Sequence, residues 1–426
     1  MLYNLFDYFK DLMDFPGMGL FKYISFRSIS AFTLSLLIGL FVGKKLIYKL
    51  AGKKIGEEIR NLGLEGQLTK KGTPTMGGVI ILIALLIPAL LLADLTNIYV
   101  LLIIVTAVWL GAIGFVDDYI KVFKKNKEGL KGKFKIIGQV ILGLIVGLSL
   151  YLSDQAVVKI PSAKGSTGAV AEVVSQEEFG EKISFFSEEK NTKTTIPFIK
   201  NNEFDYSLLS PGKGEAKETG GWIIYIITII LVVTAVSNGT NLTDGMDGLT
   251  TGISAIVGIT LAILAYVSGN VIYANYLNIM YIPNTGELVV VLAAFIGALV
   301  GFLWYNSYPA QVFMGDTGSL AIGGIIAVAA IMLKKELLIP VLCGIFFVES
   351  LSVIIQRYWF KYTRIKRGKG ERVFRMTPLH HHFQATDVEA LIKFPARPMP
   401  EAKIVARFWI IAILLAVFTL ITLKIR

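Results

Sequence analysis

The sequence predicts an all-α polytopic membrane protein, and three observations support this fold class. The chain of 426 residues is 54% hydrophobic and only 17% charged, whereas about 25% of the residues of a soluble domain are charged. It contains ten apolar segments long enough to cross a membrane as a helix, which takes about 20 residues. These segments lack the alternation of apolar and polar residues that marks the strands of a membrane barrel. We therefore expect about ten transmembrane helices.

The apolar segments divide the chain into helices and connecting loops. The long connection between the fourth and fifth segments has soluble composition, and its Gly, Ser and Thr clusters predict a small β-rich or partly disordered insertion. We expect three parts: residues 1–152 with four helices and the first acidic motif, an extracytoplasmic insertion at 153–219, and residues 220–426 with six helices and the remaining motifs. The start of the chain lacks a signal-peptide pattern, so no removable leader is expected. The ten segments cover roughly 26–43, 77–94, 98–116, 134–152, 221–237, 249–268, 288–305, 317–333, 337–356 and 404–424.

The distribution of Lys and Arg predicts the orientation. These residues gather in the loops after the first, third and ninth segments, which all lie on one side of the membrane. Short loops rich in Lys and Arg are typically cytoplasmic, so both termini are expected to be extracytoplasmic. The net charge of +11 follows from this topology and from attraction for anionic lipid heads or an anionic substrate, without a nucleic-acid partner. The single cysteine, Cys343, lies within the ninth segment and predicts a small core residue.

A polar loop between the fifth and sixth segments, SNGTNLTDGMDGL, is the first candidate site. It places Asp244 and Asp247 three residues apart, on one face if the turn is helical. Carboxylates at the mouth of a bilayer are costly to desolvate and therefore suggest function. A solvated polar turn is the alternative.

Two further acidic motifs lie at segment ends on the same predicted side. Asp117 and Asp118 end the third segment, and Lys121 follows one turn later, so a plain helical ion pair is one explanation. Asp316, in the motif MGDTGS, starts the eighth segment and could be a helix N-cap. The same helix start also offers free backbone N–H groups to a phosphate.

All three histidines of the chain are consecutive, in the motif MTPLHHHF. Their side chains point in different directions, and no second His or Cys cluster completes a zinc site. Hydrogen bonding or proton handling is the expected use of His380, His381 and His382. Glu349, inside the ninth segment, is either hydrogen-bonded structurally or borders a lipid-phosphate channel.

Taken together, the motifs predict a metal-phosphate site. Five aspartates from three separate loops fall at one membrane face, beside histidines and a lysine-rich rim. Mg²⁺ is typically held by one or two carboxylates together with a substrate phosphate. We therefore expect a divalent cation that holds a phosphate at this face.

The motifs in combination resemble a known family. DDYIK, NLTDGMDGL, YNSYPAQVFMGDTGS and MTPLHHHF are similar to motifs of the polyprenyl-phosphate N-acetylhexosamine-1-phosphate transferases. The triple histidine points to the branch of phospho-N-acetylmuramoyl-pentapeptide transferases. The resemblance extends to KKGTPTMGG and IVARFW, so it covers nearly the whole chain. Longer connections at 153–219 and 383–401 depart from the family pattern.

The resemblance implies a multi-pass enzyme of the bacterial inner membrane with its active site on the cytoplasmic face. It would move phospho-N-acetylmuramoyl-pentapeptide from a UDP carrier to undecaprenyl phosphate, giving lipid I and UMP for peptidoglycan synthesis, with Mg²⁺ as cofactor. Membrane lipids and a second copy, in a homodimer, are the expected partners. Carried over, Asp117 and Asp118 match the paired acids and Asp316 the magnesium ligand. Positions matching the substrate pocket are Lys70, Thr75, Lys121, Asn241, Asp244, Asp247, Asn306, Phe313, which would stack on uracil, Gln356, His380, His381 and His382.

Alternatives remain open at this stage. A related transferase that uses UDP-N-acetylglucosamine shares most of the motifs. An ion-coupled transporter would place its acids near the bilayer midplane rather than at segment ends. For the transferase, direct attack by the lipid phosphate, with Asp117 as base or orienting group, is favoured over a covalent aspartyl-phosphate intermediate.

Overall fold

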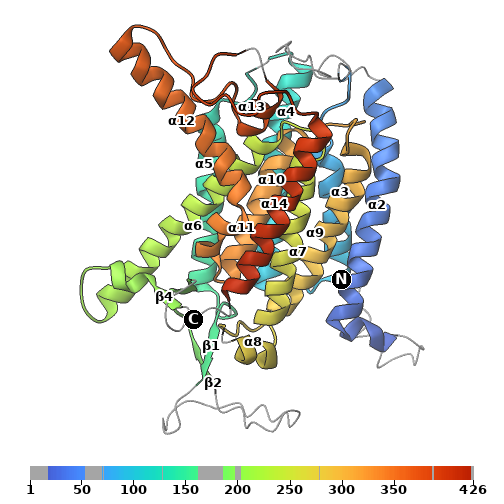
Figure 1. Cartoon of the computed structure of the whole chain (residues 1–426). Coiled ribbons are helices and arrows are strands. Elements are labelled where there is room, and N and C mark those ends of the chain that lie inside the picture. Colours follow the sequence, from blue (N-terminus) through green and yellow to red (C-terminus); the bar gives the residue numbers. More distant parts are fainter. Residues whose placement is uncertain are drawn as a thin grey trace.

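The computed structural model describes residues 18–52, 70, 72–126, 128–161, 186–196, 203–277, 279–385 and 388–423. Its long helices form one bundle, with short strands at one end and α13 at the other (Figure 1). The long helices are α2 (Ile24–Gly52), α3 (Gly78–Leu92), α4 (Ile98–Phe123), α5 (Gly132–Leu152), α6 (Glu215–Thr243), α7 (Leu249–Ser268), α9 (Thr285–Asn306), α10 (Gly315–Met332), α12 (Gly344–Arg367) and α14 (Glu401–Thr422). The short ones are η1 (Met18–Lys22), η4 (Tyr206–Leu209), α8 (Val271–Leu277), η5 (Glu336–Leu338), α11 (Ile339–Leu342) and α13 (Leu379–Gln384).

Each of the ten predicted segments is helical, which confirms the all-α membrane fold. Within the described residues, eight helices are long and apolar enough to cross a membrane. The ninth predicted segment is helical but not one straight helix, because the chain bends by 76° between Glu336–Leu342 and Gly344–Arg367. α3 has only 15 residues and is shorter than the usual span of about 20.

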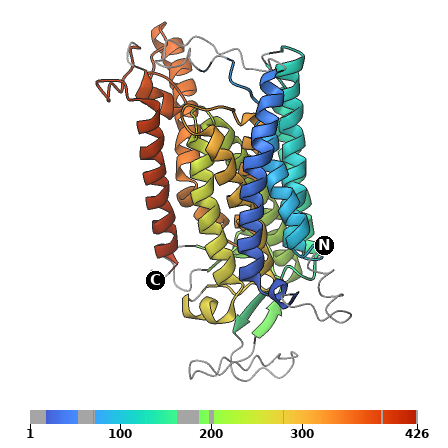
Figure 2. The ribbon, with the colours of Figure 1, turned by 90° about the vertical axis from the view of Figure 1, so that its right-hand side faces the viewer.

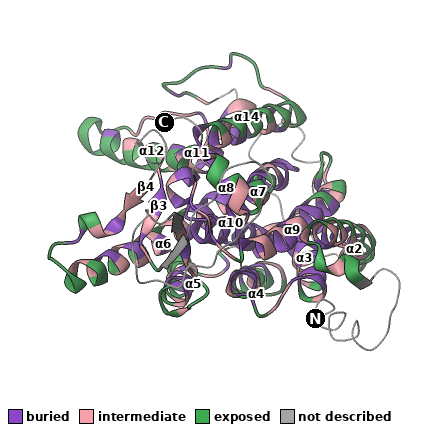
Figure 3. Ribbon diagram, turned by 90° about the horizontal axis from the view of Figure 1, so that it is seen from below, coloured by how far each residue is buried: buried purple, intermediate pink, exposed green. Residues whose placement is uncertain are grey.

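α10 is the centre of the bundle. In its most apolar window 89% of the residues are buried, and Figure 3 shows it surrounded by the other helices. Glycines let neighbouring helices approach closely. A Cβ at Gly78 would lie 2.1 Å from the Gly318 nitrogen, and one at Gly114 would lie 2.2 Å from the Asp316 carbonyl oxygen. The start of α10 is therefore fixed against α3 and α4.

The outer helices leave apolar faces exposed. α2 packs against α9 on one flank of the bundle, and α14 packs against α7 on another (Figure 2). Exposed Ile410 and Leu414 on α14, and exposed Leu351 and Ile354 on α12, face outward. Such surfaces suit contact with lipid chains.

The insertion carries short strands, as predicted for a β-rich piece. β1 (Val158–Pro161) pairs with β2 (Phe186–Glu189), and β3 (Lys193–Thr195) pairs with β4 (Glu203–Asp205), both antiparallel. Residues 162–185 and 197–202 lie outside the described residues.

β3 is fastened to the bundle by the turn after α10. The Thr195 N–H donates to the Lys334 carbonyl at 2.9 Å, and Lys335 Nζ donates to Thr195 Oγ1 at 2.5 Å. The Tyr206 hydroxyl donates to the buried carboxylate of Glu336 at 3.2 Å.

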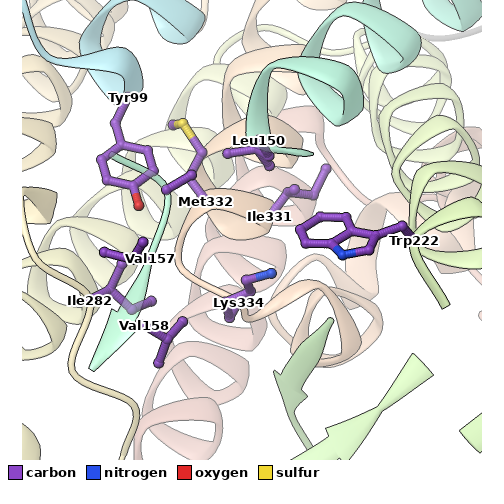
Figure 4. A pocket seen from close by; sticks show the side chains of 10 residues that line it. Tyr99, Leu150, Val157, Val158, Trp222, Ile282, Ile331, Met332 and Lys334 are labelled. Carbon is purple, nitrogen blue, oxygen red and sulfur yellow. The ribbon is translucent and has the colours of Figure 1, made fainter. Parts of the chain in front are cut away.

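A small pocket lies at this strand-bearing end, between the first turns of α4 and the last turns of α5 and α10 (Figure 4). The ammonium group of Lys334 reaches into it, 5.7 Å from the Trp222 ring centroid and 4.2 Å from that of Tyr225. Burial lowers the pKa of Lys334 to about 8. Because Tyr99 begins α4 and the paired acids end it, this pocket is at the opposite end of the bundle from the candidate site.

Candidate functional site

Three predicted acids meet at one end of the bundle. Asp117 and Asp118 come from the end of α4, and Asp316 comes from the start of α10. Oxygen atoms of the three carboxylates lie within 4.8 Å of one another. Asp117 and Asp118 are buried, whereas the Asp316 side chain is 13% exposed. The predicted meeting of these separate motifs at one face is confirmed.

Asp118 positions the start of α10. Its Oδ1 accepts the Asp316 N–H at 3.0 Å, and its Oδ2 accepts the N–H and hydroxyl of Thr317 at 2.9 and 2.6 Å. Asp316 lies in the first turn of α10 but is not its N-cap, one of the two uses considered for it. Met314 holds the N-cap position, and Asp118 accepts free N–H groups of the helix start. Gly315 has φ of 73°, and a Cβ there would lie 2.6 Å from Asp118 Oδ2.

Two lysines bridge the other two acids. Lys121 Nζ lies 2.6 Å from Asp117 Oδ2 and 3.3 Å from Asp316 Oδ1. Lys135 Nζ, from the start of α5, lies 2.9 Å from Asp117 Oδ1 and 2.5 Å from Asp316 Oδ2. The expected ion pair of Lys121 with Asp117 is confirmed. Lys135 was not predicted as a site residue, because in the sequence it is one of many lysines of a basic loop.

The donor set suits a hard divalent cation. Three carboxylates converge, and both oxygens of Asp118 are already used by N–H and O–H donors. Asp117 and Asp316 bind mainly lysine side chains, which can move aside. One or two carboxylates with water and phosphate is the usual arrangement for Mg²⁺, so the residues present fit that ion.

The loop 244–248 joins α6 to α7 beside these acids. It is not helical, so the condition under which Asp244 and Asp247 would share a helical face is not met. Asp244 is the half-buried C-cap of α6. Asp247 is buried, and accepts hydrogen bonds from Lys70 Nζ at 2.7 Å and from the Ala310 N–H at 2.9 Å. Lys70 also donates to Glu401 at 2.6 Å.

The predicted pocket asparagines are bound within the protein. Asn306 accepts from the Gly248 N–H at 3.1 Å and the Thr251 hydroxyl at 2.8 Å, and donates to the Val312 carbonyl at 2.9 Å. Asn241 Nδ2 donates to Ser319 Oγ on α10 at 2.8 Å. Asn306 therefore holds the loop in place. Asn241 connects α6 to α10 close to the acidic centre, as we call the cluster of Asp117, Asp118 and Asp316.

Thr75 and Phe313 lie in two paired backbone segments. The Phe313 N–H donates to the Pro74 carbonyl, and the Gly77 N–H donates to the Phe313 carbonyl, both at 2.8 Å. Thr75 is buried and Phe313 half-buried. The pairing brings the segment after Lys70 against the segment that precedes Asp316.

His380 packs directly on the loop 244–248. A Cβ at Gly245 would lie 2.3 Å from His380 Nε2, so only glycine fits there. The His380 N–H donates to Glu349 Oε1 at 3.1 Å, and its Nδ1 lies 3.2 Å from Glu349 Oε2. Glu349 is thus hydrogen-bonded structurally, one of the two uses expected for it.

The other two histidines differ in their surroundings. His382 Nδ1 accepts the Arg375 N–H at 3.0 Å, so its Nε2 donates to the Phe394 carbonyl at 2.7 Å. Both ring nitrogens of His382 are therefore occupied. His381 is half-buried and shares a hydrogen bond with Gln384 at 3.2 Å. Burial, with a smaller contribution from His380, lowers the pKa of His381 to about 3.

Two further residues hold the backbone around the histidines. Gln356 Oε1 accepts the N–H groups of Val373 and Phe374, both at 3.0 Å. The guanidinium of Arg375, which was not predicted, donates to the carbonyls of Ala385 at 3.0 Å, Pro395 at 2.7 Å and Lys393. Gln356 thus holds the segment before α13, and Arg375 shapes the long connection after α13, where the sequence departs from the family pattern.

All predicted site residues therefore gather at one end of the bundle. The acidic centre adjoins the segment around Phe313, and the loop 244–248 joins Lys70 to the histidines. This combination of acids, lysines and backbone-held loops can bind a divalent cation with a diphosphate. Lys135, Arg375 and Glu401 are the contacts that the sequence did not single out.

Comparison with known proteins agrees with this geometry. The pattern of glycosyl transferase family 4 matches residues 100–334, and phospho-N-acetylmuramoyl-pentapeptide-transferase signature 1 matches residues 70–82. Relatives named phospho-N-acetylmuramoyl-pentapeptide-transferase are 59% identical in Parabacteroides distasonis, 54% in Porphyromonas gingivalis strain W83 and 55% in Flavobacterium psychrophilum. Each comparison covers 100% of both chains. The chain is therefore a transferase that belongs to the phospho-N-acetylmuramoyl-pentapeptide-transferase family.

Proposed function

We propose that the enzyme transfers phospho-N-acetylmuramoyl-pentapeptide from its UDP carrier to undecaprenyl phosphate, with lipid I and UMP as products. The observation that carries this proposal is the convergence of Asp117, Asp118 and Asp316 with two lysines beside the loop 244–248. An oxygen of the lipid phosphate would form a bond to the sugar-bearing phosphorus. The bond from that phosphorus to the bridging oxygen breaks, and the oxygen leaves with UMP.

Charge neutralisation is the main task of the acidic centre. Phosphoryl transfer depends on positioning and on stabilising charge at the phosphoryl oxygens. Asp316, with Asp117 beside it, would hold Mg²⁺, which supplies this stabilisation and makes UMP a better leaving group. Lys121 and Lys135 are near enough to both acids to contact the same phosphates.

The environment of Asp117 supports direct attack by the lipid phosphate. A phosphate monoester has a second pKa of about 6 and is mostly dianionic at pH 7, so little deprotonation is needed. Asp117 is buried, and it is bound by two lysines and by the Leu130 N–H at 2.7 Å. Such a carboxylate is a poor nucleophile and a good orienting group. Burst release of UMP without lipid acceptor would support the covalent route instead.

The remaining predicted residues divide into contact and support roles. Lys70, Thr75, Asn241, Asp244 and Asp247 would contact the nucleotide, and Phe313 would stack on uracil. Among the histidines, the half-buried His381 is the one proposed to face the sugar-peptide. The hydrogen bonds of His382, Asn306 and Gln356 favour a supporting role for these residues.

One assay tests the reaction. Detergent-solubilised protein receives undecaprenyl phosphate, Mg²⁺ and either UDP-N-acetylmuramoyl-pentapeptide or UDP-N-acetylglucosamine, and UMP release is measured. We expect release with the first donor only, and its loss in Asp316→Asn. Turnover with UDP-N-acetylglucosamine alone would overturn the proposed substrate.

We also propose that the site faces the cytoplasm of a bacterial inner membrane, that the insertion lies outside, and that the protein is a homodimer. The basic loops after α4 and α12 are at the same end as the acids, which supports this orientation. The only cysteine is buried, so introduced cysteines can report the topology. In intact cells, an impermeant maleimide should label Asp154→Cys and not Lys124→Cys. Light scattering of the purified protein, corrected for detergent, should give the mass of two chains.

A further inference from the structure

We infer that Glu401 is a positioning residue that fixes the direction of the Lys70 ammonium group, so that it meets the donor diphosphate. This inference rests on the proposed function. Glu401 is the first residue of α14, and its side chain is only 8% exposed. Although it precedes the motif IVARFW, nothing in the sequence connects it to Lys70, which is 331 positions away.

A single carboxylate oxygen joins three parts of the chain. Glu401 Oε1 accepts a hydrogen bond from Lys70 Nζ at 2.6 Å and another from the Asp247 N–H at 2.7 Å. The Asp247 side chain completes the cluster, because its Oδ1 lies 2.7 Å from the same ammonium. Lys70, the loop 244–248 and the start of α14 are thereby held together.

The geometry of an ammonium group explains why two acids are present. A lysine has three N–H donors on one tetrahedral nitrogen. When two of them are bound to carboxylates, the direction of the third is fixed. With one acid alone, the group can rotate about the remaining bond. The Lys70 side chain is 16% exposed, so the third donor can meet a phosphate oxygen.

A simpler explanation is that Glu401 only stabilises α14. An acid in the first turn of a helix interacts favourably with the helix dipole. That role needs a negative charge at the position but no particular length of side chain. Aspartate and glutamate therefore distinguish the two explanations.

The test measures KM for UDP-N-acetylmuramoyl-pentapeptide and kcat in Glu401→Ala, Glu401→Asp and Glu401→Gln. We expect KM to rise about tenfold or more in Glu401→Ala, with kcat within about threefold, because a charged hydrogen bond that orders the binding site is lost. Glu401→Asp should behave like Glu401→Ala, because its shorter side chain cannot reach both partners. Glu401→Gln, which keeps an acceptor but not the charge, should be intermediate and tests the inference even if the alanine variant fails to fold.

A double-mutant cycle shows whether Glu401 acts through Lys70. In the Lys70→Met background, Glu401→Ala should change KM by less than about twofold, because the group it orients is already absent. Independent, multiplying effects would overturn the inference, as would wild-type kinetics in Glu401→Asp.

Trp409→Phe is the matched control. Trp409 Nε1 donates to the Gly248 carbonyl at 3.3 Å and so connects α14 to the same loop. Its N–H cannot bond to Lys70, because an ammonium group has no acceptor. Its KM should stay within about twofold of the wild type, and an increase equal to that of Glu401→Ala would favour a general role of α14. Absence of UMP release by the wild-type protein would instead contradict the proposed function.

Discussion

At the scale of single residues, identical side chains at the site have different roles because they have different neighbours. Asp118 is bound by backbone and hydroxyl donors and positions α10. Asp117 and Asp316 are paired with lysines, and these lysines can release the acids and bind phosphate instead. The same holds for the histidines, since both nitrogens of His382 are occupied within the protein. Burial and hydrogen-bond partners, rather than residue type, therefore distinguish side chains that can contact substrate from those that hold the protein's own backbone in place.

We expect Asp117→Asn to lower kcat by more than the 10²–10⁴-fold typical of a lost general base, because it also changes the charge around the proposed metal site. Steady-state UMP release is the measurement. Asp154→Asn is the control, because this acid is 99% exposed at the opposite end of the bundle. A near-normal rate in Asp117→Asn would exclude an essential role.

Acid should destabilise the protein partly through His381. An unfolded histidine takes up a proton near pH 6.5, whereas folded His381 has a pKa of about 3. As pH falls below 6.5 the unfolded state gains the proton first, so stability is lost progressively towards pH 3 and is unaffected above 6.5. The melting temperature of His381→Asn should therefore fall less than that of the wild type between pH 7.5 and 5. Equal falls would contradict this.

At the scale of elements, the start of α10 determines the geometry of the acidic centre. It begins at a glycine with positive φ, lies against Gly78 and Gly114 on two other helices, and receives Asp118 from α4. A shift of this helix would move Asp316 away from Asp117. The local backbone is therefore part of the site.

Gly315→Ala should reduce activity far more than the same substitution at a glycine of similar φ outside the site. The added methyl group brings left-handed strain of roughly 1–2 kcal/mol and also meets Asp118 Oδ2 at 2.6 Å. Gly368→Ala is the control, because it has φ of 72° and nothing within 4 Å of a new Cβ. UMP release should be at least about tenfold lower in Gly315→Ala than in Gly368→Ala. Similar rates in the two variants would show that the contact with Asp118 is unimportant.

At the scale of the whole molecule, hydropathy predicted most of the fold. The ten segments, their helical structure and the β-rich insertion follow from composition and length. The bend at Cys343 could not be predicted, because the apolar pattern continues through it. The division into 1–152, 153–219 and 220–426, and the homodimer, stay predictions.

The candidate site was predictable where residue types are unusual for a membrane protein, as for Asp117, Asp316 and the three histidines. Lys135, Arg375 and Glu401 were not, because their sequence surroundings resemble an ordinary basic loop or helix start. Their roles depend on long-range contacts, such as the 181 positions between Lys135 and Asp316. Only packing reveals such contacts.

Removal of the proposed Mg²⁺ should abolish activity without unfolding the protein. Lys121 and Lys135 pair with Asp117 and Asp316, so these acids do not face each other unneutralised when no cation is bound. EDTA should stop UMP release, excess Mg²⁺ should restore it, and the melting temperature should fall by only a few degrees, equivalent to about 1 kcal/mol. Unfolding by EDTA would contradict this account.

The contact of Asp118 with the start of α10 also has a consequence for biosynthesis. The two partners are 198 positions apart, so a ribosome delivers α4 to the bilayer long before α10 emerges. Until then Asp117 can pair with Lys121 and Lys135, but the acidic centre lacks Asp316, one of its three acids. During synthesis, activity would therefore first be detected when α10 has packed against α4.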